Sequence, residues 1–248
     1  MKKIKDCLYE TKLILRNVPS LVVVLFVLSV VIMNLMANKV LFRVNDFLAA
    51  DAGFILSWIP FLSMDIITKR FGPKAGIIIN ILAILINIIC VGIFTLVCII
   101  PGDGNDYSAF NQTFKGTWFI LLGSMTAMLL AGIINCILNF FIGSLFKKHP
   151  DGILAYISRT YISTFVAQFF DNMFFAYLVF RIFGPIFWPG FEAFSISVCL
   201  GSGLVGAAME LFMQIIFSPL GYKISKKWQN ENVGIEYLEY EINKNRGK

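Results

Sequence analysis

The sequence has little of what soluble enzymes usually need. Only 15% of its 248 residues are charged, whereas a soluble domain has about 25%. It contains one histidine, His149, and its five cysteines form no CxxC pair. No Walker motif, HExxH or GxSxG sequence occurs, so an active pump would need a separate motor subunit. We therefore expect no enzyme, no metal site, no disulfide and no cofactor.

Long apolar runs make up most of the chain instead. Hydrophobic residues account for 58% of it, and the mean hydropathy is +0.77. Crossing a bilayer needs about 20 apolar residues. Runs suited to this cover residues 18–37, 52–68, 75–100, 117–146, 154–182 and 193–219. The sequence therefore predicts an all-α, polytopic membrane protein: one domain of six transmembrane helices, with tails at 1–17 and 220–248. The first run is too long for the core of a signal peptide.

Basic clusters predict the orientation of the spans. They follow the second, fourth and sixth runs, at residues 69–74, 147–149 and 223–227. Positive charge concentrates in cytoplasmic segments, so both termini are expected in the cytoplasm and the loop after Ile100 outside. The net charge of +6 comes from these short clusters, which form no continuous patch for nucleic acid.

Six spans with both ends inside would also permit an inverted 3+3 repeat, as in many secondary transporters. Each half has an acidic residue in its middle span, Asp65 in the first half and Asp171 in the second. Asp65 lies nearer the cytoplasmic end of its span than Asp171 does. The sequence permits the repeat without requiring it.

The fifth run has a polar stripe along one helical face. At about 100° per residue, one narrow face holds Thr160, Thr164, Gln168, Asp171 and Phe175. An Asp in the middle of a membrane helix costs about 2.5 to 3.5 kcal/mol on insertion scales, so it usually marks a pathway or a binding site. The alternative is that Asp171 only bonds a neighbouring helix.

The other runs also bring polar groups to one face. In chain order these groups are Asn34 and Asn38, then Ser57, Asp65 and Thr68, then Asn80 and Asn87, then Ser124, Asn135 and Asn139, and finally Glu210 and Gln214. Three carboxylates and this many amides exceed what helix packing requires. We therefore predict a central polar cavity that Asp171 and Glu210 both face.

The letters GSGLVG at residues 201–206 match the dinucleotide fingerprint GxGxxG. That fingerprint must follow a strand and open a helix, whereas these glycines lie inside a predicted span. We interpret the spacings Ser202 to Gly206 and Gly203 to Ala207 as faces of small residues on which helix backbones approach closely.

Four segments together resemble the queuosine-precursor transporter family, a family of vitamin uptake transporters. They are ANKVLF at 37–42, WIPFLSMDIITKRFGPKAG at 58–76, an R-x3-ST-x3-Q-x2-D block that starts at Arg159, and SPLGY at 218–222. Members of that family are bacterial inner-membrane proteins that take up deazaguanine precursors of the tRNA base queuosine. The resemblance therefore implies this activity and this location.

The resemblance also implies roles for individual residues. With the stripes it predicts substrate-binding side chains at Asn34, Thr164, Gln168, Asp171, Phe175 and Glu210. It predicts gating or structural roles for Lys39, Asp65 and Arg159. The chain departs from many members at Lys69, where they have an acidic residue, and at Glu210, where they have a lysine.

The predicted residues suit a flat, purine-like ligand. A guanine-type edge offers adjacent N–H donors, which a carboxylate such as Asp171 or Glu210 accepts in bidentate fashion and which Gln168 can complement. Aromatic faces would stack on the ring, and the candidates are Phe174, Phe175 and Trp188. The expected partners are this substrate and the lipid bilayer, with no nucleic acid; the sequence leaves a homo-oligomer open.

The alternative function is the substrate-binding membrane subunit of an energy-coupling-factor vitamin transporter. Such subunits also have six helices. The first run has no clean Ala-xxx-Ala spacing, which argues against this alternative.

Overall fold

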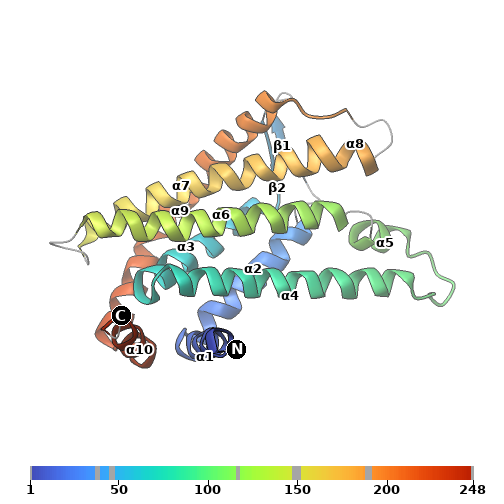
Figure 1. The fold of residues 1–248 in the computed structure, drawn as a ribbon. Helices are drawn as coiled ribbons and strands as arrows, with labels where there is room; N and C mark the ends of the chain where they lie inside the picture. Colours follow the sequence, from blue (N-terminus) through green and yellow to red (C-terminus); the bar gives the residue numbers. More distant parts are fainter. Residues whose placement is uncertain are drawn as a thin grey trace.

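The computed structural model describes residues 2–36, 40–44, 48–115, 118–146, 152–187 and 192–246. Figure 1 shows a bundle of long helices with two shorter helices, α1 and α10, side by side at one end. In chain order the elements are α1 Lys2–Asn17, α2 Ser20–Met36, β1 Val40–Val44, β2 Leu48–Asp51, α3 Phe54–Phe71, α4 Pro73–Ile99, α5 Ser108–Lys115, α6 Trp118–Leu145, α7 Ile153–Phe175, η1 Ala176–Phe183, α8 Gly184–Phe187, α9 Ile196–Asn230 and α10 Ile235–Arg246.

Four helices of the described chain are long and apolar enough to cross a membrane: α4, α6, the continuous helix over Ile153–Ile186, and α9. Residues 6–17 and α2 would make a fifth span together, but they are bent by 98° at the break between them. α3 is shorter, at 18 residues, and contains three charged side chains, Asp65, Lys69 and Arg70. The prediction of a helical, multi-pass membrane protein is confirmed. The number of six spans and the orientation stay predictions.

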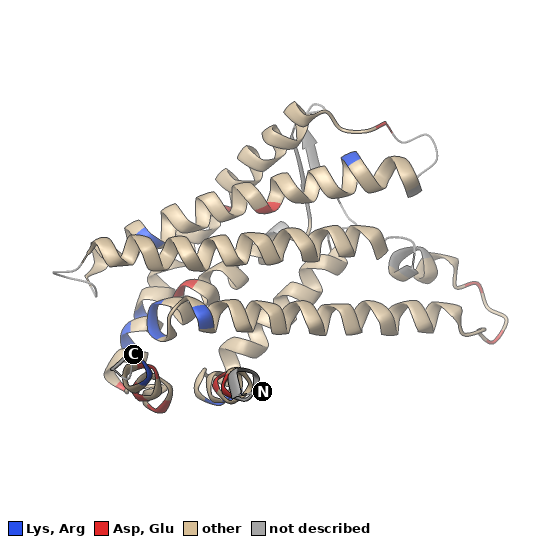
Figure 2. Cartoon of the chain, in the orientation of Figure 1, with Lys and Arg blue, Asp and Glu red and all other residues tan. Residues whose placement is uncertain are grey.

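The surface of the bundle suits a lipid environment. Large apolar side chains are exposed along the outer faces of α4, α6 and α9, for example Ile89, Phe141 and Phe212. Most lysines and arginines in Figure 2 lie at the end that also holds both termini. Polar residues are instead buried between the helices, on α3, α6, α7 and α9. Such burial of polar groups inside an apolar exterior is what a membrane protein with an internal pathway requires.

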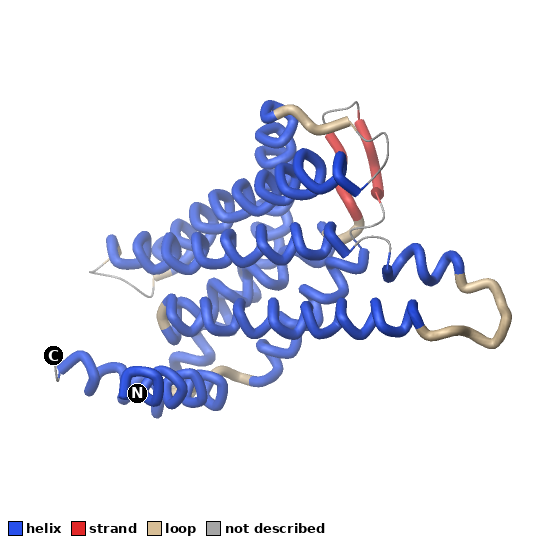
Figure 3. Tube along the Cα trace, turned by 45° about the vertical axis from the view of Figure 1, so that its right-hand side comes forward, coloured by secondary structure: helices blue, strands red, loops and turns tan. Residues whose placement is uncertain are grey.

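Two parts of the chain outside the predicted spans have regular secondary structure. Residues 40–51, which lie between the first and second predicted spans, include the antiparallel hairpin of β1 and β2, with Val44 opposite Leu48. Figure 3 shows this hairpin at the end of the bundle away from the two termini. The tails at 1–17 and 220–248 form α1, the end of α9 and α10. The hairpin is thus an addition to the predicted all-α fold.

The fifth predicted run changes its helical type along its length. The α-helical part α7 ends at Phe175, and η1 continues it as a π-helix to Phe183. Arg181 Nη1 in η1 donates to the carbonyl oxygen of Phe194 at 2.7 Å, so η1 is tied to the segment that precedes α9. π-Helical turns inside longer helices are frequent at functional sites. This one begins five residues after Asp171.

Candidate functional site

Asp65 lies at the centre of a buried set of hydrogen bonds that we call the Asp65 network. Only 1% of the residue is exposed. Its Oδ1 accepts from Asn139 Nδ2 at 2.6 Å and from Asn135 Nδ2 at 3.3 Å. Its Oδ2 accepts from Gln214 Nε2 at 3.1 Å and from Thr164 Oγ1 at 3.4 Å. One carboxylate of α3 is therefore held by four donors from α6, α7 and α9.

Arg159 extends this network with a positive charge. Its Nε donates to Asn139 Oδ1 at 3.0 Å, and Asn139 in turn donates to Asp65. A buried charge without a partner is costly, whereas a carboxylate that is hydrogen-bonded on both oxygens and has a guanidinium nearby is compensated. Gly143 leaves space for this arginine, because a Cβ there would lie 3.1 Å from Arg159 Nη1. Asp65 and Arg159 thus belong to one buried network, and their gating or structural role stays a prediction.

Lys69, one turn after Asp65, lies at the edge of the network. Its Nζ is 5.0 Å from the centre of the Tyr156 ring and 5.8 Å from that of Tyr222. Tyr156 and Tyr222 pack edge to face, with centroids 5.4 Å apart. A lysine over two aromatic faces is stabilised by cation–π attraction. These side chains lie between the Asp65 network and the end of the bundle that holds the termini.

The polar stripe of α7 points inward, as its periodicity predicts. Thr160, Thr164 and Gln168 are fully buried, and Asp171 and Phe175 are half-buried. Thr164 belongs to the Asp65 network. Within the described chain, neither Oε1 nor Nε2 of Gln168 has a hydrogen-bond partner. A buried amide in this state costs about 1 to 3 kcal/mol for each unsatisfied group, so its retention needs a reason.

Glu210 is buried one turn from Gln214 and faces α7. Its Oε2 accepts from Asn172 Nδ2 at 3.0 Å, and the same Nδ2 donates to the carbonyl oxygen of Gln168 at 2.9 Å. Gly206 makes this contact possible, since a Cβ there would lie 2.5 Å from Asn172 Cγ. Asn172 was not among the predicted site residues; the only local signal was a second polar residue directly after Asp171. The common cavity of Asp171 and Glu210 stays a prediction.

Asn34 belongs to a different contact. Ser124 Oγ of α6 donates to Asn34 Oδ1, and both lie where α2 meets α6. The aromatic residues predicted to stack on the ligand contact other rings of the protein. Phe174 stacks with Phe170, at 5.7 Å between centroids, and Phe175 packs edge to face with Phe180. Lys39 and Trp188 lie outside the described residues. The structure therefore places the predicted residues of α7 and α9 on two helices that pack together, whereas Asn34 of α2 bonds to α6.

Three donors to Asp65 were assigned to stripes but not to the site: Asn135, Asn139 and Gln214. All three are amides on otherwise apolar helix faces, and each lies four residues from another polar residue on the same face: Asn135 and Asn139 from each other, and Gln214 from Glu210. Periodicity shows that such amides point inward, but it does not show which carboxylate they bond.

A family model described as "Putative vitamin uptake transporter" matches residues 51–224, well over half of the chain. The matched range starts in β2 and ends in α9, so it includes the Asp65 network and the whole polar face of α7. No curated protein and no solved structure matches the chain.

Proposed function

Because the chain belongs to the vitamin uptake transporter family, we propose that it imports a 7-deazaguanine-type base, either queuine or a queuosine precursor, across a bacterial inner membrane. Family membership makes it a multi-pass membrane transporter. The choice of substrate rests on the R-x3-ST-x3-Q-x2-D block of α7 and on the chemistry of the residues around it.

The buried amide group of Gln168 gives the most direct support for this substrate class. It is fully buried, and its amide oxygen and nitrogen lack partners among the described residues. An amide offers one acceptor beside one donor. The lactam edge of a deazaguanine offers the complementary pair, a carbonyl oxygen beside a ring N–H. A ligand bound there would satisfy both groups of Gln168 at once.

The neighbours of Gln168 can complete such a site. Asp171 lies one turn further along α7, and Glu210 is joined to this helix through Asn172. Either carboxylate could accept the remaining N–H groups of the base, since charge-assisted bonds of this kind are shorter and stronger than neutral ones. Phe174 or Phe175 would cover one face of the ring. Few polar groups are needed to recognise a flat heterocycle.

The Asp65 network has a different task in this proposal. It connects α3, α6, α7 and α9, so these helices would move together when the site opens to one side or the other. Tyr156, Tyr222 and Lys69 would close the path towards the end that holds the termini. Transport would then require the side chains of Tyr156, Tyr222 and Lys69 to rotate out of this path while the Asp65 network keeps the four helices together.

Rescue of queuosine synthesis tests the proposed function. The chain is expressed in a bacterium that lacks precursor synthesis and its own uptake system, and the cells receive the cyano precursor, the aminomethyl precursor or queuine separately. We expect queuosine in tRNA with at least one of these bases and none with the empty vector. If the protein reaches the membrane and no base restores queuosine, the substrate assignment is wrong. Rescue only with added ATPase subunits would favour the energy-coupling-factor alternative.

A further inference from the structure

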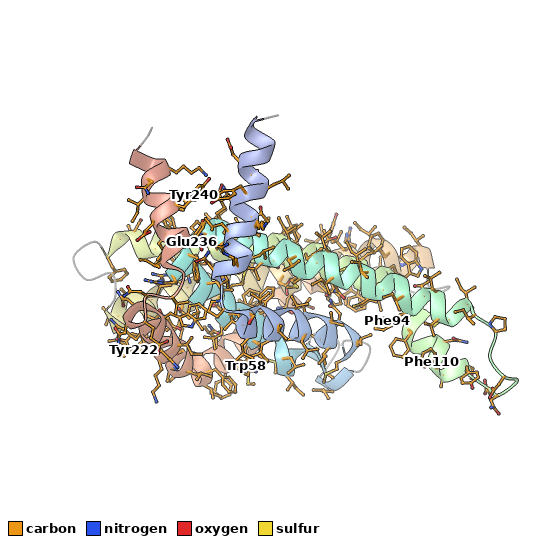
Figure 4. The ribbon with its side chains drawn as sticks, turned by 90° about the horizontal axis from the view of Figure 1, so that it is seen from below. Trp58, Phe94, Phe110, Tyr222, Glu236 and Tyr240 are labelled. Carbon is orange, nitrogen blue, oxygen red and sulfur yellow. The ribbon has the colours of Figure 1, made fainter. Side chains whose placement is uncertain are left out.

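Helix α1 lies across the end of the bundle instead of continuing into it. Residues 6–17 make an angle of 98° with α2, and only Val18 and Pro19 separate the two helices. Figure 4, a view along this end, shows α1 and α10 next to each other. α1 ends only three residues before α2 enters the apolar bundle at Ser20. At this angle α1, about 24 Å long, would run along the surface of a membrane that α2 enters.

The inner face of α1 is fixed to the protein. Leu13 and Ile14 are buried in the apolar core. Glu10 accepts from Lys244 Nζ at 2.7 Å and also forms an ion pair with Lys74 at the start of α4. These contacts hold α1 in one rotation about its axis.

Contacts with α10 fix α1 further. Arg16 pairs with Glu236, and the Tyr9 and Tyr240 rings pack edge to face with 5.7 Å between centroids. The order of these contacts makes α1 and α10 antiparallel. These contacts fix the rotation of α1 about its axis, so its opposite face points away from the protein.

That outward face is both apolar and basic. Leu8 and Leu15, seven residues apart on one stripe, are 65% and 41% exposed. Lys12 follows beside this stripe and is also exposed. Over its length α1 has five basic and two acidic residues, a net charge of +3. α10 has two basic and three acidic residues, a net charge of −1. α10 also exposes apolar side chains, Ile235 by 48% and Ile242 by 50%. Of these two helices, however, only α1 combines an exposed apolar stripe with an excess of positive charge.

We propose that the outward face of α1 docks on anionic phospholipids of the leaflet at this end of the bundle. Leu8 and Leu15 would enter the boundary between headgroups and acyl chains, while Lys12 would contact lipid phosphates. Apolar side chains beside lysine and arginine on one face are typical of helices that lie in the membrane interface. Anionic lipid attracts such basic residues over a distance that salt shortens. α10 would brace α1 from the other side without entering the lipid.

Depth-dependent quenching tests this docking on the full chain. The five native cysteines are replaced by serine or alanine, and a fluorescent label is attached through Leu8→Cys. The matched control is Glu239→Cys, an exposed position on α10. Both proteins are reconstituted in vesicles of phosphatidylcholine, with and without phosphatidylglycerol. Some lipids carry a nitroxide near the headgroup. Uptake of substrate by each labelled protein is measured in the same vesicles.

We expect the nitroxide lipids to quench most of the fluorescence at position 8 and little at position 239. Quenching at position 8 should weaken when phosphatidylglycerol is left out or when salt is raised. Equal quenching at both positions would contradict the proposal, because it would show mere nearness to the bilayer. If aqueous iodide quenches the label at position 8, the outward face of α1 lies in water. A label that neither lipid nor iodide quenches would place a protein partner or a second copy there. Both results would overturn the proposal.

Discussion

At the scale of single residues, Asp65 is the most deeply buried charged residue of the described chain. Its two oxygens accept from four side chains, and Arg159 stands behind one of them. In the low dielectric between helices a carboxylate of this kind is tolerated only while its donors stay in place. We therefore expect Asp65 to stabilise the bundle, and we expect Asp171, which is half-buried, to contribute far less.

Replacing Asp65 by Asn should show this difference. Asn replaces one carboxylate oxygen by an NH2 group, so the side chains that donated to that oxygen lose their acceptor. Each group left unsatisfied costs about 1 to 3 kcal/mol. We expect Asp65→Asn to unfold at a clearly lower temperature in detergent and Asp171→Asn to unfold near the parent. Binding of ligand by the folded Asp65→Asn protein should persist. An unchanged melting temperature for Asp65→Asn would show that the network contributes little stability.

The sequence predicts which residues point inward better than which residues meet. Thr160, Thr164, Gln168, Glu210 and Gln214 are all buried, because one helix turn of local periodicity is enough to place them. The bond between Asn172 and Glu210 depends on the distance between α7 and α9, which the glycines of α9 set. Partners from different helices are a tertiary property, so no local pattern contains them.

At the scale of helices, α7 and α9 approach closely along a line of glycines in α9. A Cβ at Gly203 would lie 2.9 Å from the carbonyl oxygen of Phe169, which belongs to the backbone and cannot rotate away. Ala207, one turn on, is fully buried. The interpretation of this segment as a small-residue packing face is thus supported by the contacts themselves.

Gly203→Ala should separate these two helices. Overpacking of this kind costs about 1 to 3 kcal/mol, so we expect a lower melting temperature and reduced uptake. Gly92→Ala in α4 is the matched control, because a Cβ there meets nothing within 4 Å. Alanine also favours helix over glycine by about 1 kcal/mol, so the control should be neutral or slightly stabilised. Equal melting temperatures for the two variants would contradict the close approach.

The contact between α1 and α10 should depend on pH through Glu10. Burial alone would raise the pKa of Glu10, but hydrogen bonds from Lys244 and Lys74 outweigh burial and lower the pKa from 4.5 to about 2. A lowered carboxylate pKa stabilises the fold above pH 4.5, and this stabilisation is lost as the pH falls towards 2. The melting temperature of Glu10→Gln should therefore lie below that of the parent at neutral pH, and the gap should close under acid.

Glu241 provides the control for this measurement. Burial raises the pKa of Glu241, and a hydrogen bond with Glu10 and the negative charge of Glu10 raise it further, so the fold disfavours the charged form of Glu241. Glu241→Gln should leave the melting temperature at pH 7 unchanged or raise it. A gap between Glu10→Gln and the parent that stays constant from pH 7 to pH 3 would show that the ion pairs do not hold α1.

The bounds of α2, α3, α4 and α6 lie within three residues of the predicted runs, but α9 continues eleven residues past position 219, to Asn230. Three irregular features do not follow from the sequence. The 98° bend falls at Val18 and Pro19, where proline removes a backbone donor, but the angle depends on packing against α4 and α10. The π-helix of η1 has no distinct composition. The hairpin of β1 and β2 is too short for its alternation to stand out from an apolar connection.

At the scale of the whole molecule, the basic end of the bundle predicts the orientation in the membrane. Cysteines placed between Gly102 and Asn111 should react with an impermeant label from outside the cell. Cysteines near Lys148, which lies outside the described residues, should react only after the membrane is opened. The reverse pattern would refute the arrangement with both termini in the cytoplasm, and with it the expected side of α1 and α10.

The claim on which this account depends most is that the polar face of α7 binds a deazaguanine through Gln168. Equilibrium binding of the three bases to purified protein tests it directly, with the parent compared to Gln168→Met. Methionine keeps the shape and removes a buried amide that lacks partners among the described residues, so stability should stay level or rise. Losing two neutral hydrogen bonds should weaken binding about 5- to 150-fold. Gln168→Met that folds normally and binds as tightly as the parent would contradict the account.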